Sequence, residues 1–370
     1  MNKRVQRLRE RMAEHNLDAM LVGAPVEDTF RTYGANRRYL SGFTGSMGWL
    51  LVTQTDAFIA VDFRYYDQAT REAPEFTLFK GNGSLERWLP DLLKEAGVQG
   101  KRVGFEPAGV TYGMYQGLQR VRETIPGSER PTFEPAPPLV EELRAIKEPE
   151  EVARLQRAVD LGDEAFEAVA ARIEPGWTET QVAWEIEMYA REHGADALSF
   201  ETIVAGGPWG AMPHAQPRDQ RIEAGQPIVI DMGVKIDGYC SDLTRTIILG
   251  EPDDQFKKIY EIVLTAQLTA EELISTEMKG EAAHMLAHNV IAEAGYGDYF
   301  GHGLGHGVGL LVHETPRLAR SSQDVLQDGM IITVEPGIYL GDWGGVRIED
   351  MAVIENGRAR ILSHAPKLSF

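Results

Sequence analysis

Two similar segments constrain the fold of this chain most strongly, because each reads as a strand that ends on an acidic residue. GQPIVID at 225–231 is echoed by GMIITVE at 329–335, 104 positions later. A second acid follows each segment: Asp242 follows the first and Glu349 the second. Corresponding helix-like stretches precede them, at 175–194 and 280–297. The pattern predicts an internal duplication in which each half contributes one acidic hairpin to a shared centre.

The first acidic segment predicts a β-hairpin over 226–249. Two β-branched runs flank Asp237-Gly238, which is a strong turn signal. If the central turn residues are 236 and 237, Asp231 lies directly opposite Asp242; if they are 237 and 238, the two are diagonal neighbours. Either register places both carboxylates on one face, where they repel each other unless a cation lies between them.

A glycine-rich loop at 300–316 lies between the second hairpin and the helix-like stretch before it. It carries His302, His306 and His313, and its glycines let the backbone and the imidazoles approach a ligand closely. Carboxylate oxygens with one imidazole are the donors that pairs of Mn²⁺, Co²⁺, Zn²⁺ or Fe²⁺ take when they activate water. The sequence therefore predicts a two-metal cage, made of Asp231, Asp242, His306, Glu335 and Glu349.

These motifs resemble those of the pita-bread metallopeptidases, specifically the Xaa-Pro peptidase branch of prolidases and aminopeptidases P. The resemblance is carried by HGLGHGVGLLVHE at 302–314, EPGIY at 335–339 and GGVRIEDM at 344–351, and it covers essentially the whole chain. It implies an α/β N-terminal domain followed by an α+β pita-bread (creatinase/aminopeptidase-like) catalytic domain with internal pseudo-twofold symmetry.

The resemblance also implies a role for each metal ligand. Asp231 would bind one divalent ion, His306 and Glu335 the other, and Asp242 and Glu349 would bridge both. Mn²⁺ is the expected ion, with Co²⁺ or Zn²⁺ as alternatives. The implied reaction is metal-assisted hydrolysis of the Xaa-Pro bond in short peptides.

Further site residues follow from the same motifs. Glu335 would be the general base and proton carrier, and either His302 or His313 would contact the scissile carbonyl. His214, in the sequence PHAQP, would line the substrate site with them. Arg347 would hydrogen-bond near the bridging carboxylates, with Tyr339 nearby.

One stretch departs from the family pattern. The helix before the histidine loop usually opens with Pro-Gly and carries an Asp and an Arg four residues apart, whereas this chain has Thr276-Glu277 and then His284 and His288. We expect this histidine pair to be a surface or packing substitution; a third metal site is the alternative.

The choice between dipeptidase and aminopeptidase P depends on recognition of the free proline carboxylate. An arginine guanidinium is well suited to bind a carboxylate, because it can donate two parallel hydrogen bonds to it. The polar segment 28–38 contains three arginines. Arg37 and Arg38 are the candidates, which favours an Xaa-Pro dipeptidase (prolidase) over an Xaa-Pro aminopeptidase.

Three other functions are disfavoured. A catalytically inactive pita-bread binding module and a metal-free, creatinase-like amidinohydrolase both conflict with the complete ligand set. A methionine aminopeptidase conflicts with the long N-terminal domain and with the proline-peptidase form of the motifs.

The organisation of the chain supports two domains. A proline-rich stretch predicts a linker at 127–140, between an N-terminal domain at 1–126 and a catalytic domain at 141–370. Strands are expected at 19–22, 49–52, 57–61 and 102–105, and helices at 84–97, 112–122 and 149–173, with a new helix capped within PGWTET at 175–180. The N-terminal domain carries the family resemblance in YLSGFTGS at 39–46 and DFRY at 62–65.

Composition narrows the range of partners. With 370 residues, of which 43% are apolar, and a net charge of −19, the chain is an acidic globular protein unsuited to nucleic acid or anionic membranes. Its one cysteine, Cys240, predicts a packed thiol. The charged amphipathic start and the absence of a long apolar run favour a cytoplasmic protein. A homodimer is expected, because the N-terminal domain of such enzymes often closes over an active-site mouth, in some cases that of the partner subunit.

Overall fold

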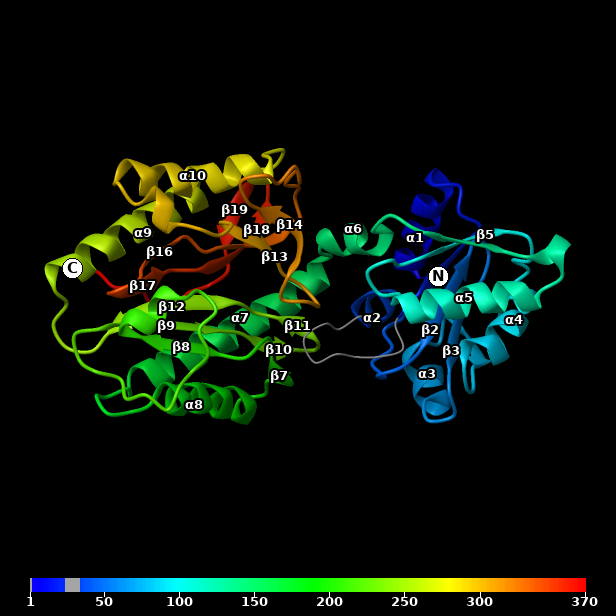
Figure 1. Ribbon diagram of the computed structural model, residues 1–370, viewed down its shortest axis with the longest axis horizontal. Helices are drawn as coiled ribbons and strands as arrows, with labels where there is room; N and C mark the ends of the chain where they lie inside the picture. The colour runs from blue at the N-terminus through cyan, green and yellow to red at the C-terminus, as the bar shows by residue number, and fades with distance from the viewer. Residues whose placement is uncertain (1, 24–33) are drawn as a thin grey trace. The chain divides into compact units, whose positions relative to one another are not determined.

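A computed structural model describes residues 2–23 and 34–370 and is shown in Figure 1. The chain divides into two compact units, Met1–Arg144 and Ala145–Phe370.

The N-terminal unit is an α/β domain built on one mixed sheet. Its described strands have the order β4-β3-β2-β1-β5-β6, with β1, β5 and β6 parallel to one another. Helices α4 and α5 bury their apolar faces on this sheet, for example through Leu89 and Leu118. The elements are α1 (Lys3–Glu14), β1 (Ala19–Val22), α2 (Ala35–Ser41), β2 (Trp49–Thr53), β3 (Ala57–Val61), α3 (Tyr66–Glu72), β4 (Thr77–Lys80), α4 (Leu85–Glu95), β5 (Arg102–Phe105), α5 (Tyr112–Thr124), η1 (Gly127–Glu129), β6 (Thr132–Pro135) and α6 (Leu139–Ala145).

The boundary between the units differs from the predicted domain limits. The segment 127–140, predicted as a linker, contains β6, which pairs in parallel with β5 at the edge of the N-terminal sheet. Proline is tolerated there because one side of an edge strand needs no ladder hydrogen bonds. The first unit therefore extends to Arg144 rather than 126, and the second begins at Ala145 rather than 141.

The C-terminal unit places antiparallel strands between two pairs of helices. Helices α7 and α8 pack together, as do α9 and α10, and Figure 1 shows α8 and α10 on opposite sides of the strands. The elements are α7 (Pro149–Ala170), α8 (Glu179–Glu192), β7 (Ala197–Leu198), β8 (Ile203–Gly206), η2 (Gly207–Ala211), β9 (Pro227–Met232), β10 (Val234–Ile236), β11 (Tyr239–Cys240), β12 (Leu243–Ile248), α9 (Asp254–Leu273), α10 (Gly280–Glu293), η3 (Gly297–Tyr299), β13 (Gly305–Gly307), β14 (Glu314–Leu318), β15 (Ile331–Val334), β16 (Gly337–Leu340), β17 (Gly344–Arg347), β18 (Asp350–Glu355) and β19 (Arg358–Ile361).

The predicted duplication is visible in this unit. Helices α8 and α10 each contain 14 residues, and each precedes an antiparallel set of strands, β8-β9-β12 in the first half and β13-β15-β18 in the second. The sequence signal for the first of these helices was correct, because Thr178 caps α8 by accepting a hydrogen bond from the Gln181 backbone.

The first hairpin adopts the second of the two predicted registers. Ile236 pairs with Tyr239, so Asp237 and Gly238 form the turn, with φ values of 51° and 80°. Both central residues of a type I′ turn need positive φ, which is why Asp-Gly is favoured there. Asp231 then pairs with Thr244, and Asp242 is its diagonal neighbour.

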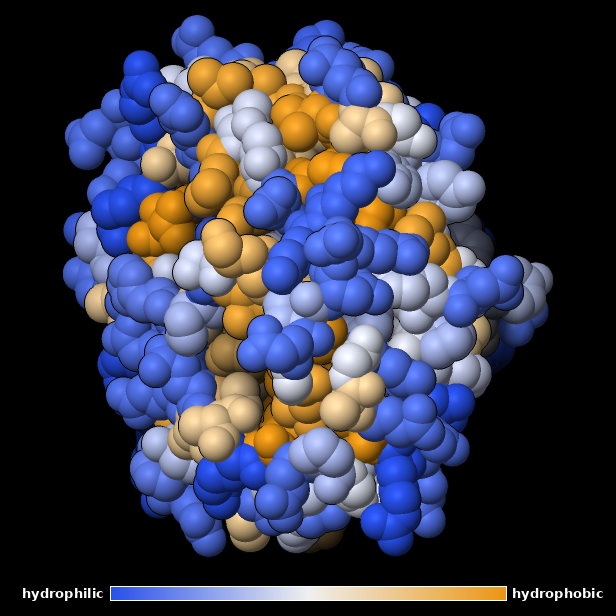
Figure 2. All heavy atoms as spheres, turned by 90° about the vertical axis from the view of Figure 1, so that its left-hand side faces the viewer, coloured by the Kyte–Doolittle hydropathy of each residue, from blue (hydrophilic) through white to orange (hydrophobic). Residues whose placement is uncertain are grey.

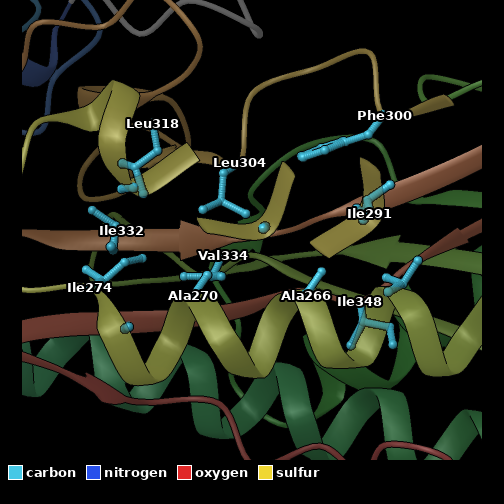
Figure 3. Packing of buried hydrophobic residues seen from close by; sticks show 14 of the residues in the cluster. Ala266, Ala270, Ile274, Ile291, Phe300, Leu304, Leu318, Ile332, Val334 and Ile348 are labelled. Carbon is cyan, nitrogen blue, oxygen red and sulfur yellow. The ribbon is translucent and has the colours of Figure 1, made fainter. Parts of the chain in front are cut away.

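The core of the second half forms where α9 lies against the strands. Figure 3 shows Ala266 and Ala270 of α9, and Ile274 directly after the helix, on the side that faces strand residues such as Val334. Alanine side chains let the helix approach the strands closely, and this buried packing supports the ends of β15 and β17, beside which the second pair of acids lies.

The surface is mixed in character. Figure 2 shows hydrophobic side chains among hydrophilic ones on one face of the molecule, and the exposed large hydrophobic residues include Leu268, Leu273 and Phe370. Among the described residues, no helix combines the length and apolar character needed to cross a membrane. Cys240 is buried, as expected for a packed thiol.

Candidate metal centre

The two hairpins bring their acids to the same place through strand register. Thr244 of β12 lies opposite Asp231 of β9, which puts Asp242 on the same face. In the second hairpin Val334 pairs with Asp350, and Glu335 and Glu349 are the next residues along the two strands. The four predicted acids are thus each held at or beside a paired strand.

The ligand atoms converge on one point. One donor atom each from Asp242, His306 and Glu349 lie within 4.8 Å of one another. His306 Nε2 is 3.6 Å from Asp242 Oδ2 and 3.4 Å from Glu335 Oε1. Because His306 Nδ1 lies 3.1 Å from the Gly307 carbonyl, the ring proton belongs on Nδ1, and the Nε2 lone pair faces the carboxylates.

Asp231 completes the set. Its Oδ2 accepts a hydrogen bond from Arg347 Nη2 at 2.6 Å. Its Oδ1 is buried and has no hydrogen-bond partner within the described part of the chain. A buried carboxylate oxygen without a donor is costly, and a divalent cation would supply the missing partner.

The electrostatics of the cluster point the same way. Burial and the neighbouring Glu349 raise the pKa of Asp242 well above its ordinary value, and burial and Glu335 do the same to Glu349. Burial raises the pKa of Glu335 to about 8 and lowers the pKa of His306 to about 3. Two buried acids, Asp242 and Glu349, and two half-buried acids, Asp231 and Glu335, lie near a neutral imidazole. Such a group of acids is a site that a divalent cation would stabilise. The five predicted ligands therefore fit a divalent metal centre.

A second layer of side chains holds the ligands in place. Arg347 Nε donates to Thr244 Oγ1 at 3.0 Å, and Thr244 donates to Glu349 Oε2 at 2.6 Å. Arg347 Nη1 donates to the Tyr339 hydroxyl at 2.9 Å. Arg347 and Tyr339 thus occupy the neighbourhood expected of them, beside the acids.

The three predicted substrate histidines differ in their availability. His302 has Nδ1 2.8 Å from the Gly303 carbonyl and Nε2 2.9 Å from the Tyr339 hydroxyl. Burial lowers its pKa to about 4. Both ring nitrogens of this neutral histidine are therefore engaged. His214 and His313 are exposed, and neither ring has a hydrogen-bond partner among the residues that the structure describes.

Two threonines of the site were missed by sequence reasoning. Thr244 and Thr333 are both fully buried. Thr333 Oγ1 donates to Glu335 Oε1 at 3.2 Å and accepts from the His306 backbone at 3.0 Å. Both threonines lie two residues from an acidic ligand on the same strand face, which is the signal that could have identified them.

An arginine was also missed. Arg317 of β14 pairs in register with His306, and its charge contributes to the lowered pKa values of His306 and His313, for which burial is the larger cause. The residue is exposed, and its guanidinium has no ion-pair or hydrogen-bond partner among the described residues. Within the described part of the chain, Arg317 is therefore an unpaired cation next to the predicted ligand His306.

The two arginines predicted to bind the substrate carboxylate, Arg37 and Arg38, differ from each other in burial. Arg37 is 1% exposed, and its guanidinium donates to the carbonyls of Gly48, at 3.0 Å, and Gly45. It therefore braces a turn of the N-terminal unit. Arg38 is half-buried. The first part of the polar segment 28–38, up to residue 33, lies outside the described residues.

The histidine pair on α10 is a packing feature. His284 is fully buried, with its ring centroid 5.3 Å from that of Phe300, and burial lowers its pKa to about 4. Arg320 Nη2 lies 2.7 Å from His288 Nε2 and places a positive charge beside the pair. No third metal donor joins the two histidines in the part of the chain that the structure describes, so the alternative of a further metal site has no support.

The acid cluster predicts a pH-dependent response to metal. The pKa of Glu335 is raised from 4.5 to about 8, so the metal-free folded state holds a proton that the unfolded state releases between these values. The metal-free protein should lose stability as pH rises through this window. Because the ion must displace this proton, we expect the increase in Tm on adding Mn²⁺ to be larger at pH 8 than at pH 6, as measured by calorimetry. An equal increase at both values would contradict the electrostatic argument.

Comparison with known proteins identifies relatives over the full length. The chain matches the model of metallopeptidase family M24 at residues 153–356 and that of the creatinase/prolidase N-terminal domain at residues 4–146. It is 40% identical over 367 residues to the uncharacterized peptidase YqhT of Bacillus subtilis, covering 98% of each. An Xaa-Pro dipeptidase from Bacillus anthracis superposes with a TM-score of 0.91 at 38% identity, covering 99% of this chain and 98% of that one. An X-Pro aminopeptidase from Thermotoga maritima superposes with a TM-score of 0.85 at 31% identity, covering 97% and 98%. The expected fold class, with its pseudo-symmetric catalytic domain, is confirmed.

Proposed function

This chain belongs to metallopeptidase family M24, and on that premise we propose that it hydrolyses the Xaa-Pro bond of short peptides, with Xaa-Pro dipeptides as its preferred substrates. The observation that carries the proposal is the close approach of donor atoms from Asp242, His306 and Glu349, with Glu335 also beside His306. A buried oxygen of Asp231 that has no partner among the described residues supports it. A peptidase with this donor set needs divalent ions, and the resemblance in the motifs assigns two of them.

The residues of the chain have distinct tasks in this reaction. When bound, the ions supply the activation of water and the stabilisation of the oxyanion. Glu335 is the proposed proton acceptor and would deliver the proton to the leaving amine. Arg347 neutralises Asp231 and orients Tyr339, so the acids keep their positions when substrate enters.

The free imidazoles are the proposed substrate contacts. His313 has its ring centroid 4.4 Å from that of His306. This contact with a proposed metal ligand supports our assignment of the scissile carbonyl to His313. His214 serves as a second contact. His302 has both ring nitrogens engaged and is assigned to holding Tyr339, although the sequence allowed it a direct role.

Arg317 supports the preference for dipeptides. A free guanidinium paired in register with a metal ligand is placed to bind the carboxylate of a C-terminal proline. Arg37 is already bonded to backbone carbonyls, and Arg38 stays a weaker candidate. The similarity to the Bacillus anthracis Xaa-Pro dipeptidase agrees with this preference.

Two alternatives are tested by the same assay. The Thermotoga maritima X-Pro aminopeptidase has the same fold, so action on longer peptides is the second candidate. A catalytically inactive binding module is the third, and the complete ligand set argues against it.

The assay is a peptide-length series. After chelation and addition of Mn²⁺ or Co²⁺, hydrolysis of Xaa-Pro and Xaa-Pro-Xaa peptides is measured for the wild type and for R317A, R38A and R37A. We expect R317A to raise KM for the dipeptide by roughly tenfold to a hundredfold, because a charge-assisted hydrogen bond is lost, and to leave the tripeptide unaffected. R320A removes a nearby exposed guanidinium and is the matched control.

The outcomes separate the candidates. Equal rates on dipeptides and tripeptides would overturn the dipeptidase preference. Cleavage of neither would overturn both enzyme proposals. If the KM for the dipeptide is unchanged in R317A, Arg317 does not bind the proline carboxylate. A raised KM in R38A would assign this role to Arg38.

The finer points of the proposal concern the ion, the assembly and the compartment. We propose manganese because oxygen-rich sites accept it readily, and elemental analysis of the purified protein tests this. A homodimer is proposed from the family resemblance and is tested by sedimentation. A cytoplasmic location is proposed because the sequence has a single cysteine and therefore no internal disulfide, and fractionation tests it.

A further inference from the structure

A buried carboxylate at the start of α8 has no part in the metal centre. Glu179 is 1% exposed. Its Oε1 accepts from the Gly206 backbone at 3.0 Å and from Arg218 Nη2 at 2.9 Å, and its Oε2 accepts from the Arg218 backbone at 2.9 Å and from Arg218 Nε at 3.0 Å. Both oxygens are therefore fully bonded, and a buried charge is matched by one guanidinium.

The two backbone donors lie at the two ends of one loop. Gly206 precedes and Arg218 follows the segment 207–217, which contains His214. A single carboxylate thus joins the ends of this loop. Trp209 adds to the closure, because its Nε1 donates to the Gln216 carbonyl at 2.9 Å and its ring lies 4.2 Å from the Arg218 guanidinium carbon.

The middle of the loop is attached to the metal centre. Arg347 Nη1 lies 3.4 Å from the carbonyl oxygen of Pro213, the residue before His214. Gly210 packs so closely on Gly345 that a Cβ added to Gly345 would lie 2.1 Å from the Gly210 oxygen. His214 therefore occupies a loop that is held at its ends by Glu179 and at its centre by β17.

The duplication shows that the helix itself does not need this acid. In the first half, the backbones of Glu179 and Thr180 donate to the carbonyls of Gln220 and Arg218, at 3.1 and 3.2 Å. The second half repeats the pair of bonds: Gly280 and Glu281 donate to Asp324 and Ser322, at 2.8 and 3.1 Å.

The position that corresponds to Glu179 in the second half is a glycine with no room for a side chain. A Cβ on Gly280 would lie 2.0 Å from the Arg317 carbonyl oxygen. The backbone frame is thus common to both halves, whereas the carboxylate belongs only to the half that carries His214.

From this arrangement we infer that Glu179 and Arg218 are positioning residues that hold His214 against the substrate. The inference rests on the proposed function, in which His214 contacts the peptide. Neither residue is among the proposed metal ligands or substrate contacts. Their effect is on the affinity for the peptide, through the conformation of the loop 207–217.

The test compares two glutamates of the same helix. E179Q keeps the size of the side chain but removes its charge. It also replaces one accepting oxygen by an NH₂ group, which cannot accept a hydrogen bond from the N–H groups of Gly206 and Arg218. E187Q removes an exposed ion pair from α8, in which Arg191 Nε lies 2.8 Å from Glu187 Oε1, and is the matched control. We expect E179Q to raise KM for an Xaa-Pro dipeptide about tenfold, with kcat changed less than about twofold and Mn²⁺ affinity unchanged. E187Q should resemble the wild type.

A double-mutant cycle with H214A distinguishes positioning from general stabilisation. If Glu179 acts through His214, E179Q adds no further increase in KM to H214A. An equal increase in both backgrounds, or an E179Q that matches E187Q, would overturn the inference. R218A, which leaves the carboxylate its two backbone donors, provides the same test with a smaller expected increase if E179Q does not fold.

Amide exchange separates this inference from the proposed function. In E179Q without substrate, amides of 207–217 should exchange about tenfold faster than in the wild type. Unchanged exchange would contradict the positioning role whatever the activity. Faster exchange, with a wild type that cleaves no Xaa-Pro peptide, would overturn the proposed function and leave the role of Glu179 in the loop supported.

Discussion

Replacing Asp242 with asparagine should reduce kcat/KM for an Xaa-Pro dipeptide by about a thousandfold or more, because metal ions supply several kcal/mol of transition-state stabilisation. Asp242 is 5% exposed, and a donor atom of its side chain lies within 4.8 Å of those of His306 and Glu349. Asparagine keeps the shape of the side chain and loses the charge that balances the ions. The measurement is kcat/KM with Mn²⁺ in excess, together with the metal content after dialysis.

The control for this substitution is Asp342→Asn. Asp342 is exposed in the turn between β16 and β17, so the same chemical change there should leave activity and metal content at wild-type values. A D242N protein that keeps its ions and its activity would contradict the assignment of Asp242 as a metal ligand.

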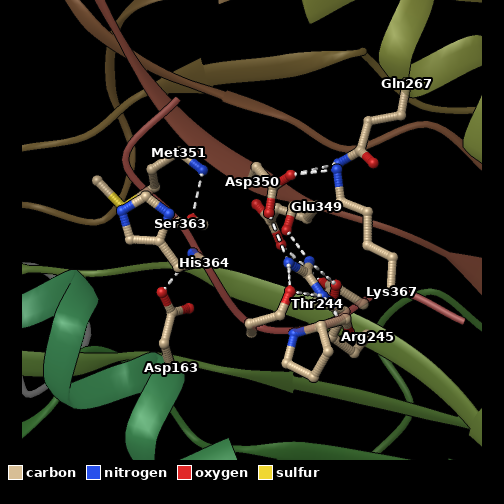
Figure 4. A network of polar contacts seen from close by, with 12 residues as sticks. Asp163, Thr244, Arg245, Gln267, Glu349, Asp350, Met351, Ser363, His364 and Lys367 are labelled. Atoms are coloured by element: carbon tan, nitrogen blue, oxygen red, sulfur yellow. Dashed lines mark hydrogen bonds and ion pairs between the residues drawn. The ribbon is translucent and has the colours of Figure 1, made fainter. Parts of the chain in front are cut away.

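Replacing Asp350 with alanine should lower the free energy of unfolding by about 3 to 5 kcal/mol, the usual cost of removing one partner from a buried ion pair. Figure 4 shows the network: Asp350 accepts from Arg245 Nη2 at 2.7 Å and lies 2.5 Å from Lys367 Nζ. Asp350 and Arg245 are each 1% exposed, so the alanine leaves a buried guanidinium without its carboxylate.

This ion pair lies directly behind the metal ligands. Arg245 follows Thr244, Asp350 follows Glu349, and Arg245 Nη1 donates to the Glu349 carbonyl at 2.5 Å. Although burial alone would raise it, Arg245 and Lys367 lower the pKa of Asp350. Its stabilisation is therefore present above the ordinary aspartate pKa and is lost in acid.

Urea unfolding of the metal-free protein measures the effect of D350A. E355A is the control, because Glu355 pairs with Arg360 at the surface, where both side chains are more than two-fifths exposed. An exposed pair contributes at most about 1 kcal/mol. Equal losses in the two variants would show that the buried network is not a main source of stability.

The sequence predicted most of the regular structure because its local signals agreed with the final packing. The runs at 19–22, 57–61 and 102–105 are strands with those limits, and Asp-Gly formed the hairpin turn with positive φ. β6 was missed because prolines surround it, and proline signals a linker unless the strand lies at a sheet edge. Its position in the sheet depends on β5, which is distant in the sequence.

The residues of the candidate site that belong to sequence motifs could be predicted, and the others could not. Acids that end strands and a histidine in a glycine-rich run are uncommon, so the five ligands stood out. Glu179 and Arg317 are ordinary residues whose importance arises from partners on other elements, and no local pattern reveals those partners. Arg37 shows the reverse error, since a polar segment suggested exposure where the fold buries the guanidinium.

Anomalous diffraction from crystals of the Mn²⁺-loaded protein, collected at the manganese edge, tests the central claim most directly. Two peaks are predicted, both enclosed by Asp231, Asp242, His306, Glu335 and Glu349. A single peak at full activity, or ions bound by other side chains, would contradict the account.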